Sequence, residues 1–244
     1  MKIKNLKVCD RLIISLDVSS KKEVINLCKK INNSVTTLKL GLELIYSNGL
    51  SIIDTIKSFG YKVMLDAKLM DIPNTISNAV AAITKLGVDK ITIHTLGGER
   101  MLKDAKSRLR EECYKINITA PMLFAVTILT SLDSGDLINL GFKADPLHSV
   151  LNLAKIAVES GIDGIICSPD EVKSIRESLG SNFYIATPGI RLPEDLKSDQ
   201  KRFSTPSKAI KDGADYIIVG RSITLKENIT DAVKNILYEI ERSL

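Results

Sequence analysis

Short apolar runs rich in β-branched residues alternate along this chain with longer segments in which apolar residues recur every three or four positions. Eight runs have the length and composition of buried strands: residues 12–17, 37–40, 62–66, 90–94, 122–128, 164–168, 183–186 and 216–220. The alternation predicts βα units around a parallel sheet.

Helical spacing is clearest in five intervening segments, which are marked by Val24/Leu27/Cys28/Ile31, Leu50/Ile53/Ile56, Ile76/Val80/Ile83/Leu86, Val150/Leu153/Ala157 and Val233/Ile236/Leu237/Ile240. Gly60, Gly87, Gly161 and Gly213 each stand between a helical segment and a strand. A glycine in the left-handed region ends many helices, so we predict helix ends at these four positions.

The count of elements favours one α/β domain over residues 1–244, a (β/α)8 TIM barrel. A doubly wound sheet would usually carry a Gly-x-Gly-x-x-Gly turn after its first strand, and residues 17–21 contain no glycine. Residues 191–207 form a long irregular stretch after the seventh predicted strand. In a barrel this is the catalytic rim, and we expect a loop that covers the substrate.

Composition excludes several classes of protein. With 44% hydrophobic and 26% charged residues, the chain is neither disordered nor collagen-like. No apolar run approaches the roughly 20 residues of a membrane span, and Cys9, Cys28, Cys113 and Cys167 form no Cys-x-x-Cys pair. We therefore expect a soluble protein of the reducing cytoplasm, without a membrane or zinc site.

The net charge of +5 is spread along the chain, and only 5% of the residues are aromatic. A nucleic-acid-binding module remains an alternative, but basic residues interleaved with aromatic ones, which would favour it, are not seen. We predict no nucleic-acid partner.

Charged residues recur where the predicted strands end. Asp17 ends the first strand, Lys39 lies near the end of the second, and the run from Asp66 through Lys68 to Asp71 follows the third. In a barrel these ends meet at one opening. If the side chains converge, the acids keep each lysine charged, which suits a proton donor better than a Schiff-base nucleophile.

Two other interpretations of this charged cluster stay open. The residues could form solvated ion pairs at the rim, each contributing about 0 to 1 kcal/mol. Oxygen ligands could instead hold Mg²⁺, although Lys39 and Lys68 would repel the ion. A catalytically dead barrel would be expected to lack some of these charges.

A second cluster follows the last two strands, where Gly189 precedes Arg191 and Gly220 precedes Arg221. Barrels often bind phosphate with these loops, through backbone amides and an arginine, so we predict a phosphate site, with a plain turn and surface cation as the alternative. His94 is expected to be a hydrogen-bonded histidine of the core or rim, with a catalytic base as the alternative, and His148 an exposed residue at a helix start.

Together these residues resemble the orotidine 5′-phosphate decarboxylase family. The signature is residues 64–75, Met-Leu-Asp-Ala-Lys-Leu-Met-Asp-Ile-Pro-Asn-Thr, and the agreement continues through residues 12–17, 38–41, 125–131, 187–191, 199–200 and 219–221. Bacterial members often carry Phe-His where Leu69 and Met70 stand, which puts local packing in question more than activity.

The resemblance implies a decarboxylase of pyrimidine synthesis that converts orotidine 5′-monophosphate to uridine 5′-monophosphate without cofactor or metal. Lys68 would protonate C6 of the pyrimidine, and Asp66 would lie beside the departing carboxylate. Lys39 would hold Asp66 and a ribose hydroxyl, and Asp17 would bind the ribose.

The remaining implied roles concern the phosphate, the base and a second subunit. Asp71 and Thr75 would reach into the neighbouring site of a homodimer. The substrate-binding residues would further include Thr130 at the base and Arg191, Gln200, Gly220 and Arg221 toward the phosphate. The nearest alternative is a Mg²⁺-dependent sugar-phosphate decarboxylase or aldolase on the same barrel, which normally has a glutamate where Lys39 stands.

Overall fold

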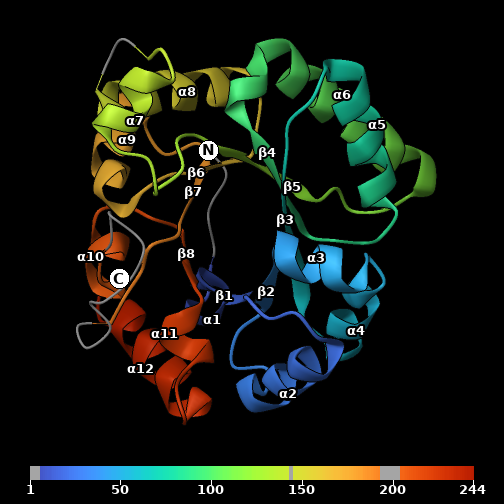
Figure 1. The fold of residues 1–244 in the computed structure, drawn as a ribbon, viewed down its shortest axis with the longest axis vertical. Coiled ribbons are helices and arrows are strands. Elements are labelled where there is room, and N and C mark those ends of the chain that lie inside the picture. Colours follow the sequence, from blue (N-terminus) through green and yellow to red (C-terminus); the bar gives the residue numbers. More distant parts are fainter. Residues whose placement is uncertain (1–5, 143–144, 193–203) are drawn as a thin grey trace.

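The computed structural model describes residues 6–142, 145–192 and 204–244. Its eight strands, β1 (Leu12–Leu16), β2 (Thr37–Leu40), β3 (Lys62–Leu69), β4 (Lys90–His94), β5 (Met122–Val126), β6 (Gly164–Ile166), β7 (Tyr184–Thr187) and β8 (Tyr216–Val219), close into a parallel barrel (Figure 1). Consecutive strands pair in sequence order and β8 returns to β1, where Leu12 lies opposite Ile217. The predicted TIM barrel is confirmed.

Helices surround the barrel (Figure 1). They are α1 (Val8–Arg11), α2 (Lys21–Ile31), α3 (Leu42–Asn48), α4 (Ile52–Ser58), α5 (Pro73–Thr84), α6 (Gly98–Ile116), α7 (Ser134–Asn139), α8 (Pro146–Glu159), α9 (Val172–Leu179), α10 (Pro206–Lys211), α11 (Arg221–Thr224) and α12 (Ile229–Glu241), with short 3₁₀ helices η1 (Thr95–Gly97) and η2 (Pro169–Glu171). The part of the chain that the structure describes holds no helix long and apolar enough to cross a membrane.

Local sequence signals explain several helix ends. Gly60, Gly87, Gly161 and Gly213 have φ of 86°, 64°, 75° and 107°, as the helix-end prediction requires. Ser20 begins α2 with a capping box in which Glu23 reaches back to the Ser20 N–H.

The predicted element boundaries were wrong in places. The strand predicted over residues 62–66 continues to Leu69, so Asp66 and Lys68 lie within β3 and do not follow it. The runs over residues 122–128 and 164–168 overstate β5 and β6, because loop residues beyond them, such as Ile128, are buried as well. Leu50 lies outside α4 and is 41% exposed.

Two apolar clusters make up the core. The larger fills the space between strands and helices, and the smaller fills the barrel with Ile13, Met64, Phe124, Val126, Ile166, Ala186, Tyr216 and Ile218. A Cβ on Gly164 would lie 2.4 Å from Cε1 of Phe124, so only glycine leaves room for this ring. The filled interior supports the floor of a cavity at the carboxyl ends of the strands.

Lys90, the first residue of β4, is an exception in this apolar interior. It is 4% exposed, its Nζ lies 3.4 Å from Oγ1 of Thr37 and 5.2 Å from the centre of the Tyr216 ring. Burial, reinforced by the nearby charge of Lys62, lowers the pKa of Lys90 to about 8, against opposing effects of Asp89 and Asp10. The folded protein therefore binds this proton more weakly than the unfolded chain does.

Lys90→Met is expected to raise the free energy of unfolding at pH 7 by on the order of 2 kcal/mol, because the variant no longer buries a charge. The lowered pKa makes wild-type stability rise between about pH 8 and the unfolded lysine value near 10.4, so the gain should shrink over that range. Urea unfolding at pH 7 and pH 10 measures this, with Lys22→Met, at an exposed position of α2, as control. A Lys90→Met protein less stable than wild type at pH 7 would contradict it.

Candidate active site

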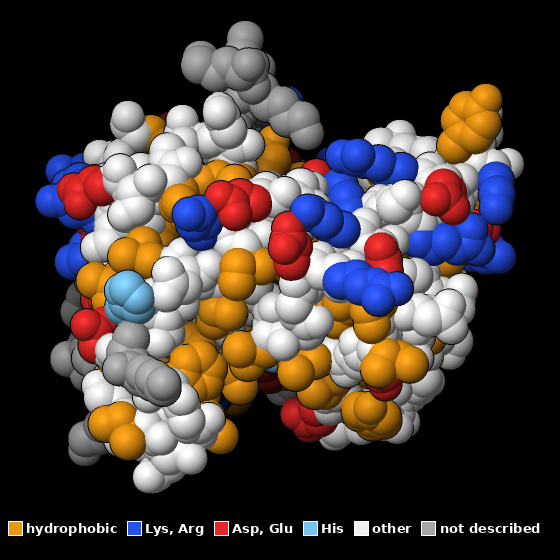
Figure 2. Space-filling view, turned by 90° about the horizontal axis from the view of Figure 1, so that it is seen from above, with side chains coloured by type: hydrophobic (Ala, Val, Ile, Leu, Met, Phe, Trp, Pro, Cys, Tyr) orange, Lys and Arg blue, Asp and Glu red, His pale blue; other side chains and the backbone are white. Residues whose placement is uncertain are grey.

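A cavity of about 340 Å³ opens at the carboxyl ends of the strands. Its charged lining comes from β2, β3 and the segments that follow β1, β7 and β8, and its apolar lining includes Val126, Ile166 and Ile218 from the barrel interior. Figure 2 shows a face on which basic and acidic side chains are interspersed, with apolar side chains around a hollow at one edge. The face shown presents no continuous basic stripe.

An irregularity in β3 places the central charges. Leu65 of β3 pairs with Ile91 of β4 and Leu69 pairs with Ile93, so three β3 residues stand opposite Thr92 alone. Lys68 has φ of 48°, a left-handed conformation that a residue with a Cβ seldom adopts. Such conformations cost about 1–3 kcal/mol and gather at functional sites.

Asp66 is the centre of an ion-pair cluster. One of its oxygens, Oδ2, lies 3.0 Å from Nζ of Lys39 and 2.8 Å from Nζ of Lys68. Burial is the largest single influence and acts to raise the pKa of Asp66, but the two ammonium groups together outweigh it and lower the pKa to about 2. The carboxylate is therefore charged at any physiological pH.

Asp17 extends this cluster toward β8. Its Oδ1 lies 3.9 Å from Nζ of Lys39 and accepts a 2.6 Å hydrogen bond from the Ser15 hydroxyl. A Cβ on Gly220 would lie 2.6 Å from Oδ2 of Asp17. The glycine therefore lets the ends of β1 and β8 approach each other beside the cavity.

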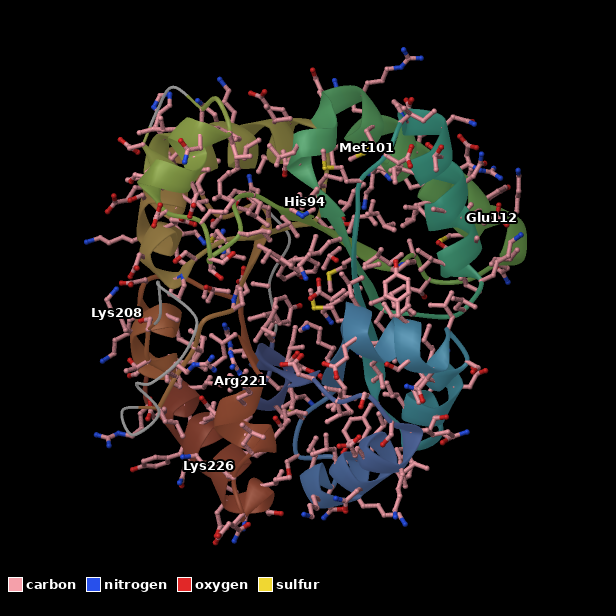
Figure 3. The ribbon with its side chains drawn as sticks, in the orientation of Figure 1. His94, Met101, Glu112, Lys208, Arg221 and Lys226 are labelled. Atoms are coloured by element: carbon pink, nitrogen blue, oxygen red, sulfur yellow. The ribbon has the colours of Figure 1, made fainter. Side chains whose placement is uncertain are left out.

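His94 ends β4 (Figure 3). Burial, and then the Lys68 charge, lower its pKa, which favours the neutral ring. Nδ1 is buried without a hydrogen-bond partner among the described residues, so the expected hydrogen bonding was wrong for this atom. His148 is exposed in the first turn of α8, as predicted, and its N–H donates to Asp145.

The predicted phosphate residues follow β7 and β8. Gly189, Arg191, Gly220 and Arg221 all line the cavity, as does Thr130 in the loop after β5. Figure 3 shows Arg221 at the start of α11. Arginines from the loops after β7 and β8 therefore border the cavity that contains the Asp66 cluster.

The stretch after β7 is only partly described. Gln200 and most of residues 191–207 lie outside the described residues, so the predicted covering loop stays a prediction. Its two ends are joined where the N–H of Arg191 donates to the Ser204 carbonyl at 2.9 Å and the N–H of Ser204 donates to the Gly189 carbonyl at 3.0 Å. The stretch therefore leaves and returns beside the cavity.

Asp71 and Thr75 do not join the cluster in this chain. Both are exposed and neither lines the cavity, and Oδ1 of Asp71 accepts the Ile72 N–H at 2.6 Å. The set of three carboxylates and two ammoniums considered from the sequence is thus reduced to Asp17, Asp66, Lys39 and Lys68.

Sequence reasoning missed Ser15 and Thr92. Strand alternation could have found Ser15, two residues before Asp17 and on the same side. Thr92 contacts Asp66 because of the β3 irregularity, which no sequence pattern signals.

The cluster does not fit a divalent metal. The described residues contain no group of three or more His, Cys, Asp or Glu side chains that could hold an ion. More directly, an ion at Asp66 would face two ammonium groups within 3.0 Å of the same carboxylate oxygen. The β2 side chain that contacts Asp66 is Lys39, where the Mg²⁺-dependent alternative needs an acid.

Comparison with known proteins supports a specific family. Residues 10–236 match the model described as "Orotidine 5'-phosphate decarboxylase / HUMPS family". The chain is 42% identical to the orotidine 5′-phosphate decarboxylase of Carboxydothermus hydrogenoformans over 95% of this chain and 96% of that protein, and 43% identical to that of Fusobacterium nucleatum over 89% and 90%.

Solved structures of similar sequence share the fold of this chain. The crystal structure of orotidine 5′-phosphate decarboxylase from Lactobacillus acidophilus superimposes with a TM-score of 0.83 at 38% identity, covering 95% of this chain and 99% of that one. An uncharacterized conserved protein from Geobacillus kaustophilus gives a TM-score of 0.82 at 32% identity, over 94% and 99% of the two chains.

Proposed function

The chain belongs to the orotidine 5′-phosphate decarboxylase / HUMPS family, and from this premise we propose that it is a carboxy-lyase that converts orotidine 5′-monophosphate to uridine 5′-monophosphate in pyrimidine synthesis. The observation that carries the proposal is the Lys39–Asp66–Lys68 cluster at the cavity, together with the names of its relatives. The reaction proceeds without cofactor or metal.

Lys68 is the proton donor. The bond between C6 and the carboxylate breaks, CO₂ leaves, and the electron pair stays on a ring carbon that has no cofactor to accept it. An ammonium beside C6 stabilises this charge and then transfers its proton to form the C6–H bond. The Lys68 side chain is 33% exposed against 11% for Lys39, so Lys68 is the amine that water can protonate again.

Asp66 and its neighbours orient this donor. Because the pKa of Asp66 is about 2, the carboxylate stays charged, holds Nζ of Lys68 and stands beside the departing carboxylate of the substrate. Lys39 lies between Asp66 and Asp17, which suits contacts with ribose hydroxyls. The cluster thus places the sugar and the reacting carbon at adjacent points.

The rest of the nucleotide extends across the cavity. Thr130 contacts the base, and Arg191, Gly220 and Arg221, with Gln200, take the phosphate. An arginine fork matches phosphate oxygens through paired hydrogen bonds. Binding energy from this remote group orients the ring.

The active unit is a homodimer in which Asp71 and Thr75 complete the partner's site. Support comes from their exposure on this chain and from the apolar surface beside them, where Met70 is 54% and Ile72 66% exposed. The enzyme acts in the cytoplasm, which fits the free thiols of Cys9, Cys28 and Cys113.

Mixing two inactive variants tests the dimer. Lys68→Ala and Asp71→Asn homodimers should each be nearly inactive, but a hybrid keeps one site with both native residues. If subunits exchange at random, half the dimers are hybrid with one working site each, so activity should recover to about a quarter of wild type. As a control, each variant is mixed with itself. If the mixture of the two variants is no more active than the two variants measured separately and added together, the shared site is contradicted.

The proposed reaction is tested by following the absorbance loss of orotidine 5′-monophosphate with purified protein. We expect turnover that EDTA leaves unchanged, because the cluster has no place for a cation. Loss of activity in EDTA with recovery in Mg²⁺ would favour the metal-dependent alternative, and no turnover would refute the proposal. Binding to nucleic acid with a steep salt dependence would instead favour a nucleic-acid-binding module.

A further inference from the structure

Thr92 lies at the middle of β4, opposite the irregular part of β3, and is completely buried. Its Oγ1 accepts a 2.8 Å hydrogen bond from the backbone N–H of Lys68 and donates a 3.0 Å hydrogen bond to Oδ1 of Asp66. One hydroxyl group thus contacts both residues on which the proposed chemistry depends.

The geometry of the two strands explains why this hydroxyl is needed. Between the pairs Leu65–Ile91 and Leu69–Ile93 the regular register is lost, and the Lys68 N–H bonds to a side chain. A backbone N–H that is buried without a partner loses its hydrogen bonds to water and gains nothing in return, which destabilises the fold. The Thr92 hydroxyl removes this cost and thereby stabilises the left-handed conformation of Lys68, with φ of 48°.

The second hydrogen bond fixes the carboxylate. Oδ2 of Asp66 accepts from the two lysines, and Oδ1 accepts from Thr92. With both oxygens held, rotation of the carboxylate about its Cβ–Cγ bond is restricted. The direction of the Asp66–Lys68 ion pair is then set from both ends, at the Lys68 backbone and at the Asp66 side chain.

We propose that Thr92 is a positioning residue for the Asp66–Lys68 pair, whose hydroxyl sets the place of the proton-donating ammonium without touching the substrate. Thr92 is absent from the lining of the cavity, which separates it from the groups that bind substrate. The inference rests on the proposed decarboxylase function for its consequence in catalysis.

Three variants test it. Thr92→Val keeps the size and removes the hydroxyl, and kcat for orotidine 5′-monophosphate should fall roughly 10- to 100-fold with KM changed less than about threefold, since a misplaced catalytic group slows chemistry more than binding. Thr92→Ser keeps the hydroxyl and should stay within about threefold of wild type. Thr84→Val is the control, because its hydroxyl is equally buried but donates to the Val80 carbonyl within α5, and its kcat should stay within about twofold.

Several results would overturn the inference. They are an unchanged kcat in Thr92→Val, an equal loss in Thr92→Ser, which would indicate packing of the methyl group, or an equal loss in Thr84→Val, which would indicate a general effect on stability.

A second measurement is independent of turnover. Hydrogen exchange of the Lys68 backbone amide should be at least about tenfold faster in Thr92→Val than in wild type and in Thr92→Ser, because only the valine variant leaves this N–H without its acceptor. If wild type fails to decarboxylate orotidine 5′-monophosphate, the proposed function falls, and this exchange rate alone decides whether Thr92 holds Lys68. Equal exchange in all three proteins would refute that role.

Discussion

Lys68→Ala is expected to reduce kcat for decarboxylation by roughly 10⁴-fold or more. General acid catalysis contributes about 10²–10⁴, and the same ammonium provides the electrostatic stabilisation of the carbanion, worth about another 10²–10³. Alanine supplies neither, and Lys39 cannot replace it, because its Nζ is held between Asp66 and Asp17. The rate is measured by absorbance loss with saturating substrate.

The Lys68→Ala substitution should affect binding of the product far less than it affects turnover. Uridine 5′-monophosphate has no carboxylate at C6 and keeps its phosphate contacts, so its Kd, measured by calorimetry, should change less than about tenfold in Lys68→Ala. Lys22→Ala, on the exposed face of α2, controls for the loss of a lysine. Substantial turnover in Lys68→Ala would assign the proton to another group, and an equal loss of product binding would assign Lys68 to ground-state binding.

The barrel was predictable because its signal is repeated. Each of the eight strands is a short buried run, and the glycines at 60, 87, 161 and 213 end helices in the conformation that glycine favours. The long helix α6 was not recognised, since only a narrow stripe of it, such as Met101, Leu102, Ala105 and Leu109, is buried among many charges. The buried positions keep helical spacing, so the helix was missed because apolar residues are few among its charges and not because they lack periodicity.

The sequence could predict only those residues of the site that stand at or near the ends of strands. Lys39 of β2 lies opposite Met64 of β3, two residues before Asp66, and Lys68 follows Asp66 at the two-residue spacing of one face. The contact from Thr92 depends on a register shift between β3 and β4, which arises from the packing of two strands and from no local pattern. In the proposed homodimer Asp71 acts in the site of a second chain, so one chain's sequence indicates the residue but not its place.

Arg221→Ala is expected to raise KM for orotidine 5′-monophosphate roughly 100-fold. A charge-assisted hydrogen bond contributes about 1.5–3 kcal/mol, and an arginine can make two to one phosphate. Arg221 begins α11 directly after Gly220, at the end of the cavity formed by the loop after β8. The affinity for uridine 5′-monophosphate should fall by a similar factor.

The ligand without its phosphate distinguishes this role from damage to the fold. Uridine lacks the group that Arg221 binds, so its weak binding should be the same in wild type and in Arg221→Ala, whereas a distorted barrel would weaken both ligands. The matched control is Arg100→Ala, since this side chain is 87% exposed on α6, and it should leave both affinities unchanged.

Turnover provides a further test of Arg221. If phosphate binding orients the ring over Lys68, kcat should also fall in Arg221→Ala. A variant with normal kcat would show that the phosphate contributes only to binding. An unchanged KM would place the phosphate elsewhere in the cavity.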